Sequence, residues 1–126
     1  MPTKYVSTSG APRPGGPYSQ GVIAGGLLFV SGQIPLDPAT DKMVEGDIKV
    51  QTEQVLKNLL AVLKEAKMGP ENVVKTTVYL ADMADFETYN AVYREFFTQP
   101  YPARTTVGAA LAPGLMVEIE AVAKLQ

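Results

Sequence analysis

The chain contains no cysteine and no histidine in its 126 residues. Without cysteine it can form no disulfide and has no thiol redox chemistry, so the composition gives no sign of secretion. The same absences exclude zinc sites built on thiolate or imidazole, Cys or His nucleophiles, and the Ser-His-Asp triad. Any chemistry must therefore rest on carboxylate, guanidinium, hydroxyl, amide and backbone groups.

Long apolar runs are also missing. No apolar stretch approaches the roughly 18 residues that a membrane span needs, and residues 1–5 lack the basic start and apolar run of a targeting segment. We therefore expect a cytoplasmic protein with no membrane partner.

Positive charge is neither abundant nor clustered. The chain has 11 Lys and Arg against 13 Asp and Glu, a net charge of −2, and its cations are scattered. Since a polyanion-binding surface needs locally dense cations, we expect no nucleic-acid partner. The acidic segment 37–47 lacks the spacing and central Gly of an EF-hand, so we interpret it as a solvated loop and expect no metal ion.

The length suits one domain over residues 1–126. Apolar residues at three-and-four spacing predict a helix over 47–67 and a second from residue 82 to just before Pro100. Alternating or β-branched patterns predict six strands, and Gly25-Gly26 predicts a hairpin between the second and third of them. The strands are expected near residues 4–7, 22–24, 27–31, 73–80, 104–111 and 116–124. The resulting order favours an α+β fold with both helices on one face of a mixed sheet.

Charged residues on the last two expected strands are the strongest functional signal. If the turn between these strands centres on Pro113, a simple antiparallel register places Thr106 opposite Glu120 and Arg104 diagonal to it. The residues alone leave two interpretations open. Arg104 and Glu120 either form an ion pair at a subunit boundary or serve as the cation and carboxylate of a ligand site.

The last strand also predicts how the sheet is covered. One set of alternating residues suits a face packed under the helices: Val117, Ile119, Ala121 and Ala123. The opposite face, with Val122 near Thr77 and Tyr79, would then expose apolar surface on a small protein. Such patches usually mark an interface, so we expect self-association, most economically in a cyclic oligomer.

Seven short strings, in a consistent order, carry a family resemblance. They are Gly16–Gly21, Val30–Pro35, Val74–Tyr79, Tyr89–Tyr93, Phe96–Phe97, Pro102–Val107 and Val117–Ala121. Together they resemble the Rid family of reactive intermediate deaminases, also called the YjgF family, over essentially the whole chain.

The resemblance implies a chorismate-mutase-like fold of order βββαβαββ, with a mixed six-stranded sheet and two helices on one face. It further implies a homotrimer whose clefts lie between subunits. Family members of this kind hydrolyse enamines and imines, such as 2-aminoacrylate, 2-iminopropanoate and 2-iminobutanoate, to 2-keto acids and ammonia. They use no metal or organic cofactor, and their role is the control of metabolite damage.

Site residues follow from the same resemblance. Arg104 matches the family's carboxylate-binding arginine, and Glu120 matches the acidic residue that positions water. At residue 106, prominent deaminases of the family carry Cys where this chain has Thr, which bears on substrate preference more than on reaction type. The substrate-binding residues implied are Tyr18, Ser31, Gly32, Asn90 and Thr106.

Simpler roles remain open for several of these residues. Tyr18 is either a lid over the substrate or an aromatic anchor for its Gly- and Pro-rich loop. Gly32 admits close approach of a ligand or merely ends a strand. Asn90 holds a ligand or satisfies neighbouring backbone, and Glu118 is expected to be solvated or paired. At the level of function, the alternatives are a keto-acid-binding or regulatory protein without turnover, and a nuclease or translation-directed role.

Overall fold

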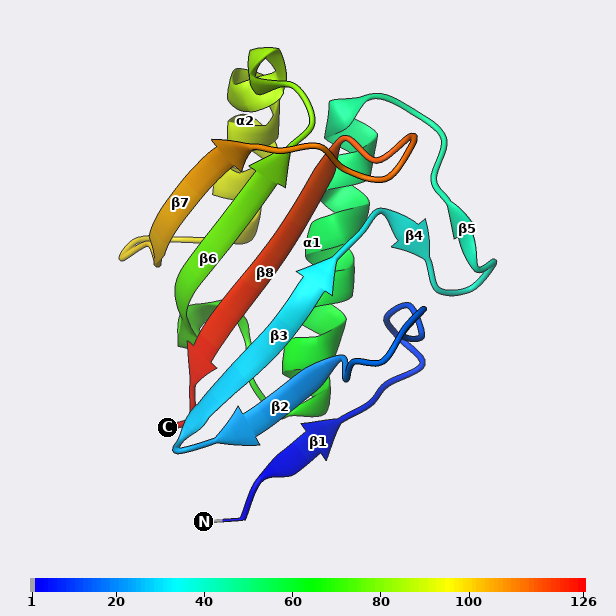
Figure 1. Ribbon diagram of the computed structural model, residues 1–126. Helices are drawn as coiled ribbons and strands as arrows, with labels where there is room; N and C mark the ends of the chain where they lie inside the picture. The colour runs from blue at the N-terminus through cyan, green and yellow to red at the C-terminus, as the bar shows by residue number, and fades with distance from the viewer. Residues whose placement is uncertain (1) are drawn as a thin grey trace.

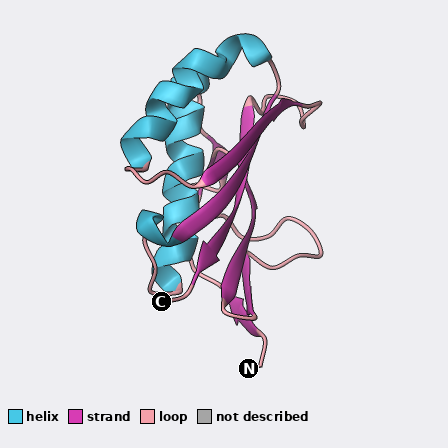
Figure 2. Cartoon of the chain, turned by 90° about the vertical axis from the view of Figure 1, so that its left-hand side faces the viewer, coloured by secondary structure: helices cyan, strands magenta, loops and turns pink. Residues whose placement is uncertain are grey.

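A six-stranded mixed sheet carries both α-helices on one face (Figures 1 and 2). The computed structural model describes residues 2–126. In chain order its strands and α-helices are β1 Lys4–Val6, β2 Gly21–Ala24, β3 Leu27–Gln33, β4 Leu36–Asp37, β5 Lys42–Met43, α1 Ile48–Glu65, β6 Val73–Leu80, α2 Phe86–Phe96, β7 Ala103–Gly108 and β8 Val117–Lys124. The sheet order is β1-β2-β3-β8-β6-β7, which confirms the predicted class. The separate β4–β5 pair was not predicted.

Two glycines make the predicted hairpin between β2 and β3. Gly25 and Gly26 have φ values of 60° and 78°, which cost glycine little because it has no Cβ. With both central residues at positive φ, the turn twist matches the twist of the antiparallel strands that it joins.

Helix α1 begins at the predicted cap. The side chain of Asp47 accepts a hydrogen bond from the backbone N–H of Val50 at 3.1 Å. The predicted apolar stripe is buried under the sheet and includes Val55, Leu56 and Leu59. The helix ends slightly earlier than Gly69-Pro70 suggested, because Lys67 adopts the left-handed conformation with φ 61°.

Helix α2 follows a short 3₁₀ turn over Met83–Asp85. Asp82 caps that turn by accepting a hydrogen bond from the N–H of Ala84 at 2.9 Å, so the predicted acidic start is present one turn before the α-helix. The predicted aromatic stripe of α2 faces the sheet, where Tyr89 and Tyr93 are buried.

The predicted antiparallel pairing of the last two strands is wrong. Strand β6 lies between β7 and β8, pairing in parallel with β7 and antiparallel with β8. A helical crossover such as α2 normally joins parallel strands, so β7 returns beside β6 at the sheet edge. The segment 109–116 then crosses the end of β6, with hydrogen bonds from Ala109 N to Leu80 O and from Ala81 N to Met116 O.

The two faces of the sheet differ sharply, as the side view in Figure 2 shows. On β8 the predicted inward set, Val117, Ile119, Ala121 and Ala123, is buried beneath the helices. The helix-free face exposes apolar side chains, including Phe29, which pairs across strands with Val122. No helix within residues 2–126 has the length and apolar character needed to cross a bilayer.

Candidate functional site

Arg104 lies on the edge strand β7 and is held by helix α2. Its Cζ atom is 4.7 Å from the centroid of the Tyr93 ring, with the rings of Tyr89 and Phe86 at 5.6 and 5.7 Å. Its Nη1 atom donates to Oδ1 of Asn90 at 2.7 Å. Aromatic faces attract a guanidinium without neutralising it, and an amide oxygen orients it. This aromatic platform therefore fixes a cation whose charge remains available.

The guanidinium of Arg104 has no carboxylate partner within the described chain. Among residues 2–126 the only salt bridge joins Arg13 and Asp41, at 3.8 Å. Arg104 instead borders a hollow of about 340 Å³ whose lining contains no acidic side chain. The lining residues are Asn90, Tyr93, Arg94, Tyr101, Pro102 and Arg104. An oriented, unneutralised guanidinium beside such a hollow is suited to binding a carboxylate.

Two threonines fix the platform from the sheet side. Thr106 Oγ1 and the hydroxyl of Tyr89 share a 2.7 Å hydrogen bond, and Thr76 Oγ1 shares one of 2.7 Å with the hydroxyl of Tyr93. Burial raises the pKa of both tyrosines, so both stay neutral hydrogen-bonding groups. The hydroxyl of Thr106 is thus engaged with Tyr89, a contact that the sequence did not predict.

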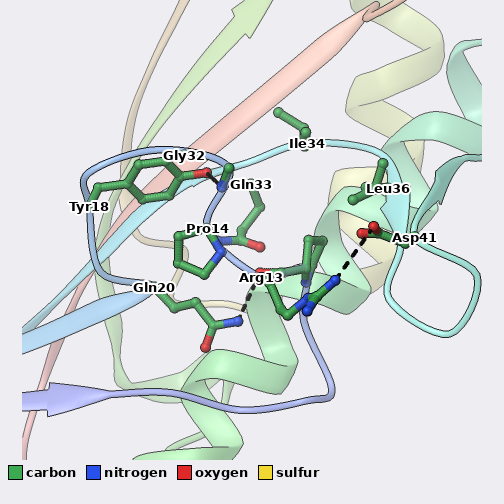
Figure 3. Close-up of a pocket in the computed structure, with 11 residues that line it drawn as sticks. Arg13, Pro14, Tyr18, Gln20, Gly32, Gln33, Ile34, Leu36 and Asp41 are labelled. Carbon is green, nitrogen blue, oxygen red and sulfur yellow. Dashed lines mark hydrogen bonds and ion pairs between the residues drawn. The ribbon is translucent and has the colours of Figure 1, made fainter.

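A second cluster surrounds Gly32 on β3. Gly32 and Tyr18 line a hollow of about 410 Å³, and Figure 3 shows Tyr18 on one side of it and Asp41 on the other. The hydroxyl of Tyr18 accepts a hydrogen bond from Gly15 N at 3.2 Å, which ties the ring to its own loop. Ser31 donates through Oγ to the carbonyl of Ser19 at 2.6 Å.

Glu118 adjoins Gly32 without lining this hollow, whose acidic lining residue is Asp41. The carboxylate of Glu118 occupies the space that a Cβ at residue 32 would fill, so the glycine allows the acid to approach the backbone of β3. Burial, reinforced by the charge of Glu120, raises the pKa of Glu118. A half-buried carboxylate with a raised pKa is a typical acid–base candidate.

Glu120 has a different environment. It is exposed, and its Oε1 accepts a hydrogen bond from the hydroxyl of Tyr79 at 2.6 Å, a contact that raises the pKa of Tyr79. The sequence predicts Glu120 as a site residue and Glu118 as solvated or paired. The alternation of β8 places both carboxylates on one face, and their neighbours distinguish them: Gly32 beside Glu118 and Tyr79 bonded to Glu120.

Within one chain, Arg104 and Glu120 lie on opposite faces of the sheet. Arg104 is paired with Thr76 of β6 and Glu120 with Thr77, and consecutive strand residues point to opposite sides. The predicted proximity of Arg104 and Glu120 inside one chain is therefore wrong, because it assumed a hairpin that does not form. Of the predicted site residues, Arg104, Asn90 and Thr106 lie together, and Tyr18, Ser31 and Gly32 form the second cluster.

The fold first defines a class, that of small α+β proteins built on one mixed sheet with two helices on one face. A solved member is TdcF of E. coli with bound serine, which matches this chain with a TM-score of 0.91 and 37% identity, covering 98% of this chain and 99% of that chain. The chain belongs to the Endoribonuclease L-PSP family, the YjgF, RutC and Rid group, whose model matches residues 8–125.

Two curated relatives illustrate the family. A RutC family protein of Pyrococcus horikoshii is 50% identical over 121 residues, covering 95% of this chain and 96% of the relative. Reactive Intermediate Deaminase A, chloroplastic, of Arabidopsis thaliana is 47% identical over 123 residues, covering 97% of this chain and 66% of the relative. The resemblance to the Rid family predicted from short sequence strings is thus confirmed.

Proposed function

We propose that this protein is a hydrolytic deaminase of reactive enamines and imines, including 2-aminoacrylate, 2-iminopropanoate and 2-iminobutanoate. The observation that carries the proposal is the guanidinium of Arg104, oriented by Asn90 and Tyr93 with no carboxylate partner in residues 2–126. The name of the Arabidopsis relative supports the reaction class. The serine bound to TdcF supports a ligand of amino-acid size with a carboxylate.

Arg104 binds the carboxylate of the imino acid. A guanidinium presents two parallel N–H groups that match the two carboxylate oxygens, and such charge-assisted pairs are among the stronger hydrogen bonds. With Nη1 bonded to Asn90, the other donors of the guanidinium remain for the ligand. This contact places the neighbouring C=N carbon at a fixed position.

Hydrolysis needs a positioned water and a path for one proton. Water adds its oxygen to the imine carbon, the nitrogen takes up a proton, and the resulting carbinolamine loses ammonia to leave the 2-keto acid. A single carboxylate that accepts the proton from water and returns it to nitrogen can supply about 10²–10⁴-fold of acceleration. No covalent enzyme intermediate, metal or organic cofactor is required.

Two carboxylates are candidates for this proton transfer. The sequence prediction names Glu120, and the geometry adds Glu118, which adjoins Gly32 and is the more buried of the two. We propose that Glu118 transfers the proton, while Glu120 accepts the hydrogen bond from the hydroxyl of Tyr79.

The site is proposed to form between subunits of a homotrimer. Arg104 and Glu118 lie on opposite faces of one chain, so one ligand can meet both only when a second copy brings its own Gly32 cluster to the first copy's Arg104. The exposed apolar side chains of the helix-free face, such as Phe29, support burial of that face between copies. Tyr18, Ser31 and Gly32 of one copy would then complete the binding site begun by Asn90 and Arg104 of the next.

The direct test generates the imine in the reaction mixture. An amino-acid oxidase generates 2-iminobutanoate, semicarbazide traps it, and the protein should lower the yield of the trapped adduct while raising the rate of 2-oxobutanoate release. Absence of any acceleration would contradict the proposal. Binding of 2-oxobutanoate without acceleration would instead support the keto-acid-binding alternative.

Gly32→Ala is expected to lower deamination by about 10–100-fold while leaving unfolding within about 1 kcal/mol of the wild type. The added methyl group meets the far end of the Glu118 side chain, which can swing away at little cost to the fold but leaves its working position. Steady-state kinetics and denaturant unfolding measure the two effects. Gly108→Ala is the control, because its Cβ also meets a flexible side chain, that of Met83, and it lies outside both hollows. Equal activity of both variants would contradict the role of Glu118.

Glu118→Gln is expected to lower kcat by about 10²-fold or more, and Glu120→Gln to have a smaller effect. Because burial raises the pKa of Glu118, the acid limb of the wild-type kcat/KM profile should lie above the ordinary Glu value of about 4.3, and Glu118→Gln should remove it. A larger loss in Glu120→Gln would instead support Glu120 as the residue that positions water.

The same variant has a stability signature. A carboxyl whose folded pKa exceeds its unfolded pKa binds protons more tightly in the folded state, so its ionised form costs stability above the folded pKa. Glu118→Gln should therefore raise Tm most at pH values above that pKa. The gain should shrink as pH falls through the folded pKa and vanish below the unfolded one. A gain that does not vary with pH would show another cause.

A further inference from the structure

Arg94 borders the same hollow as Arg104. It lies on α2 one turn after Asn90, and residues four apart share a helix face. Asn90 therefore lies near two guanidinium groups, that of Arg104 on β7 and that of Arg94 on its own helix. Both arginines are exposed, and both line the hollow of about 340 Å³. The hollow therefore has two cationic side chains around one amide.

Neither arginine is neutralised within the described residues. No carboxylate of residues 2–126 lies within salt-bridge distance of Arg94 or Arg104, and the lining of the hollow contains no acid. Glu87 of α2 is the acidic side chain of a neighbouring hollow. With Phe86, Asn90 and Arg94 it borders this hollow of about 350 Å³. It moderates the positive potential of this surface without forming an ion pair.

The hollow has room for a small-molecule ligand. Its volume of about 340 Å³ falls within the range of about 300–1,000 Å³ that ligand pockets commonly span. A single carboxylate uses one guanidinium, which leaves the second without a role in binding a monoanionic substrate. Two guanidinium groups at one hollow match a ligand with two separated anionic groups.

We propose that the site accepts 2-imino dicarboxylic acids, with Arg94 binding the distal carboxylate while Arg104 binds the one next to the imine carbon. This inference rests on the proposed function and names its substrate class. The reaction is unchanged: water adds to the C=N carbon, ammonia leaves, and the product is a 2-oxo dicarboxylate. The distal carboxylate takes no part in bond making or breaking.

The test compares 2-iminoglutarate with 2-iminobutanoate, each generated from its amino acid by an oxidase and scored by semicarbazide trapping. The measured quantity is the ratio of their kcat/KM values. Arg94→Gln keeps the side-chain stem while removing the charge, and it should lower the ratio by about fivefold, the scale of a partly exposed ion pair. Glu87→Gln should raise the ratio, because it removes the neighbouring negative charge.

Lys57→Gln, an exposed residue of α1 outside both hollows, is the control and should leave the ratio unchanged. The effect of Arg94→Gln should shrink as salt is raised from 0.05 to about 0.5 M, because exposed charges are screened. An unchanged ratio in Arg94→Gln, or an equal fall in Lys57→Gln, would overturn the inference.

Direct binding separates this inference from the proposed function. Calorimetry measures the affinities for 2-oxoglutarate and 2-oxobutanoate, and the ratio of these affinities gives the preference for a dianion without turnover. If neither imine is accelerated, the proposed function fails, yet a preference for 2-oxoglutarate that falls in Arg94→Gln would still support the dianion site. If both imines are accelerated and Arg94→Gln changes neither ratio, the dianion site alone fails.

Discussion

Arg104→Lys is expected to lower kcat/KM for 2-iminobutanoate by roughly 10²-fold, and Arg104→Ala by more. Lysine keeps the positive charge but presents no planar fork, so it cannot hold both carboxylate oxygens or stack on Tyr93 as the guanidinium does. The imine carbon would then lose its fixed position relative to the water. Initial rates over a range of imine concentrations measure the loss.

The fold should survive both Arg104 substitutions. Arg104 is exposed on an edge strand, and its contacts are with faces of rings that are separately bonded to Thr76 and Thr106. Thermal unfolding and the oligomeric state in gel filtration serve as controls. Near-normal turnover by a well-folded Arg104→Lys protein would contradict carboxylate binding by Arg104, and loss of the oligomer would shift its role to assembly.

The elements that the sequence predicts well are those with strong local signals. Helix α1 combines a capping Asp47 with an apolar stripe, and the Gly25-Gly26 turn has a conformation that few other residues adopt. The inward face of β8 follows from simple alternation. Each of these features depends on neighbours within a few residues, so local sequence patterns are sufficient to predict them.

The features that the sequence missed depend on pairing between distant segments. A turn at Pro113 fits a hairpin locally, but the crossover through α2 places β7 on the far side of β6. Arg104 and Glu120 consequently face opposite sides, which no local pattern reveals. Non-local strand pairing sets the face of every residue on a strand, so an incorrect neighbour also misplaces the site.

The difference between the two carboxylates of β8 also depends on a distant strand. Glu118 and Glu120 alternate identically along β8, and their environments differ because Gly32 of β3 lies beside only the first. The hydrogen bond between the hydroxyls of Thr106 and Tyr89 of α2 likewise joins distant segments, so the sequence does not predict it. Short strings identify the family, whereas the pairing of distant strands distributes the side chains over two clusters.

Subunit mixing should restore activity to two inactive variants. Arg104→Ala lacks the carboxylate-binding group and Glu118→Gln lacks the proposed proton acceptor, so each should be nearly inactive alone. If each site takes Arg104 from one copy and Glu118 from its neighbour, every mixed homotrimer of the two variants keeps about one site in three intact. Co-expression with two affinity tags and tandem purification isolates the mixed oligomers, whose deamination rate is then measured.

The recovery discriminates between the two possible locations of the site. A site built within one chain would stay broken in every subunit, because each carries one of the two substitutions. A mixture of Arg104→Ala with the double variant Arg104→Ala/Glu118→Gln is the matched control and should stay inactive, since no subunit supplies the guanidinium. Because the fold places Arg104 and Glu118 on opposite faces of one sheet, recovery to about a third of the wild-type rate is the expected result, and mixed oligomers as inactive as their parents would exclude a shared site.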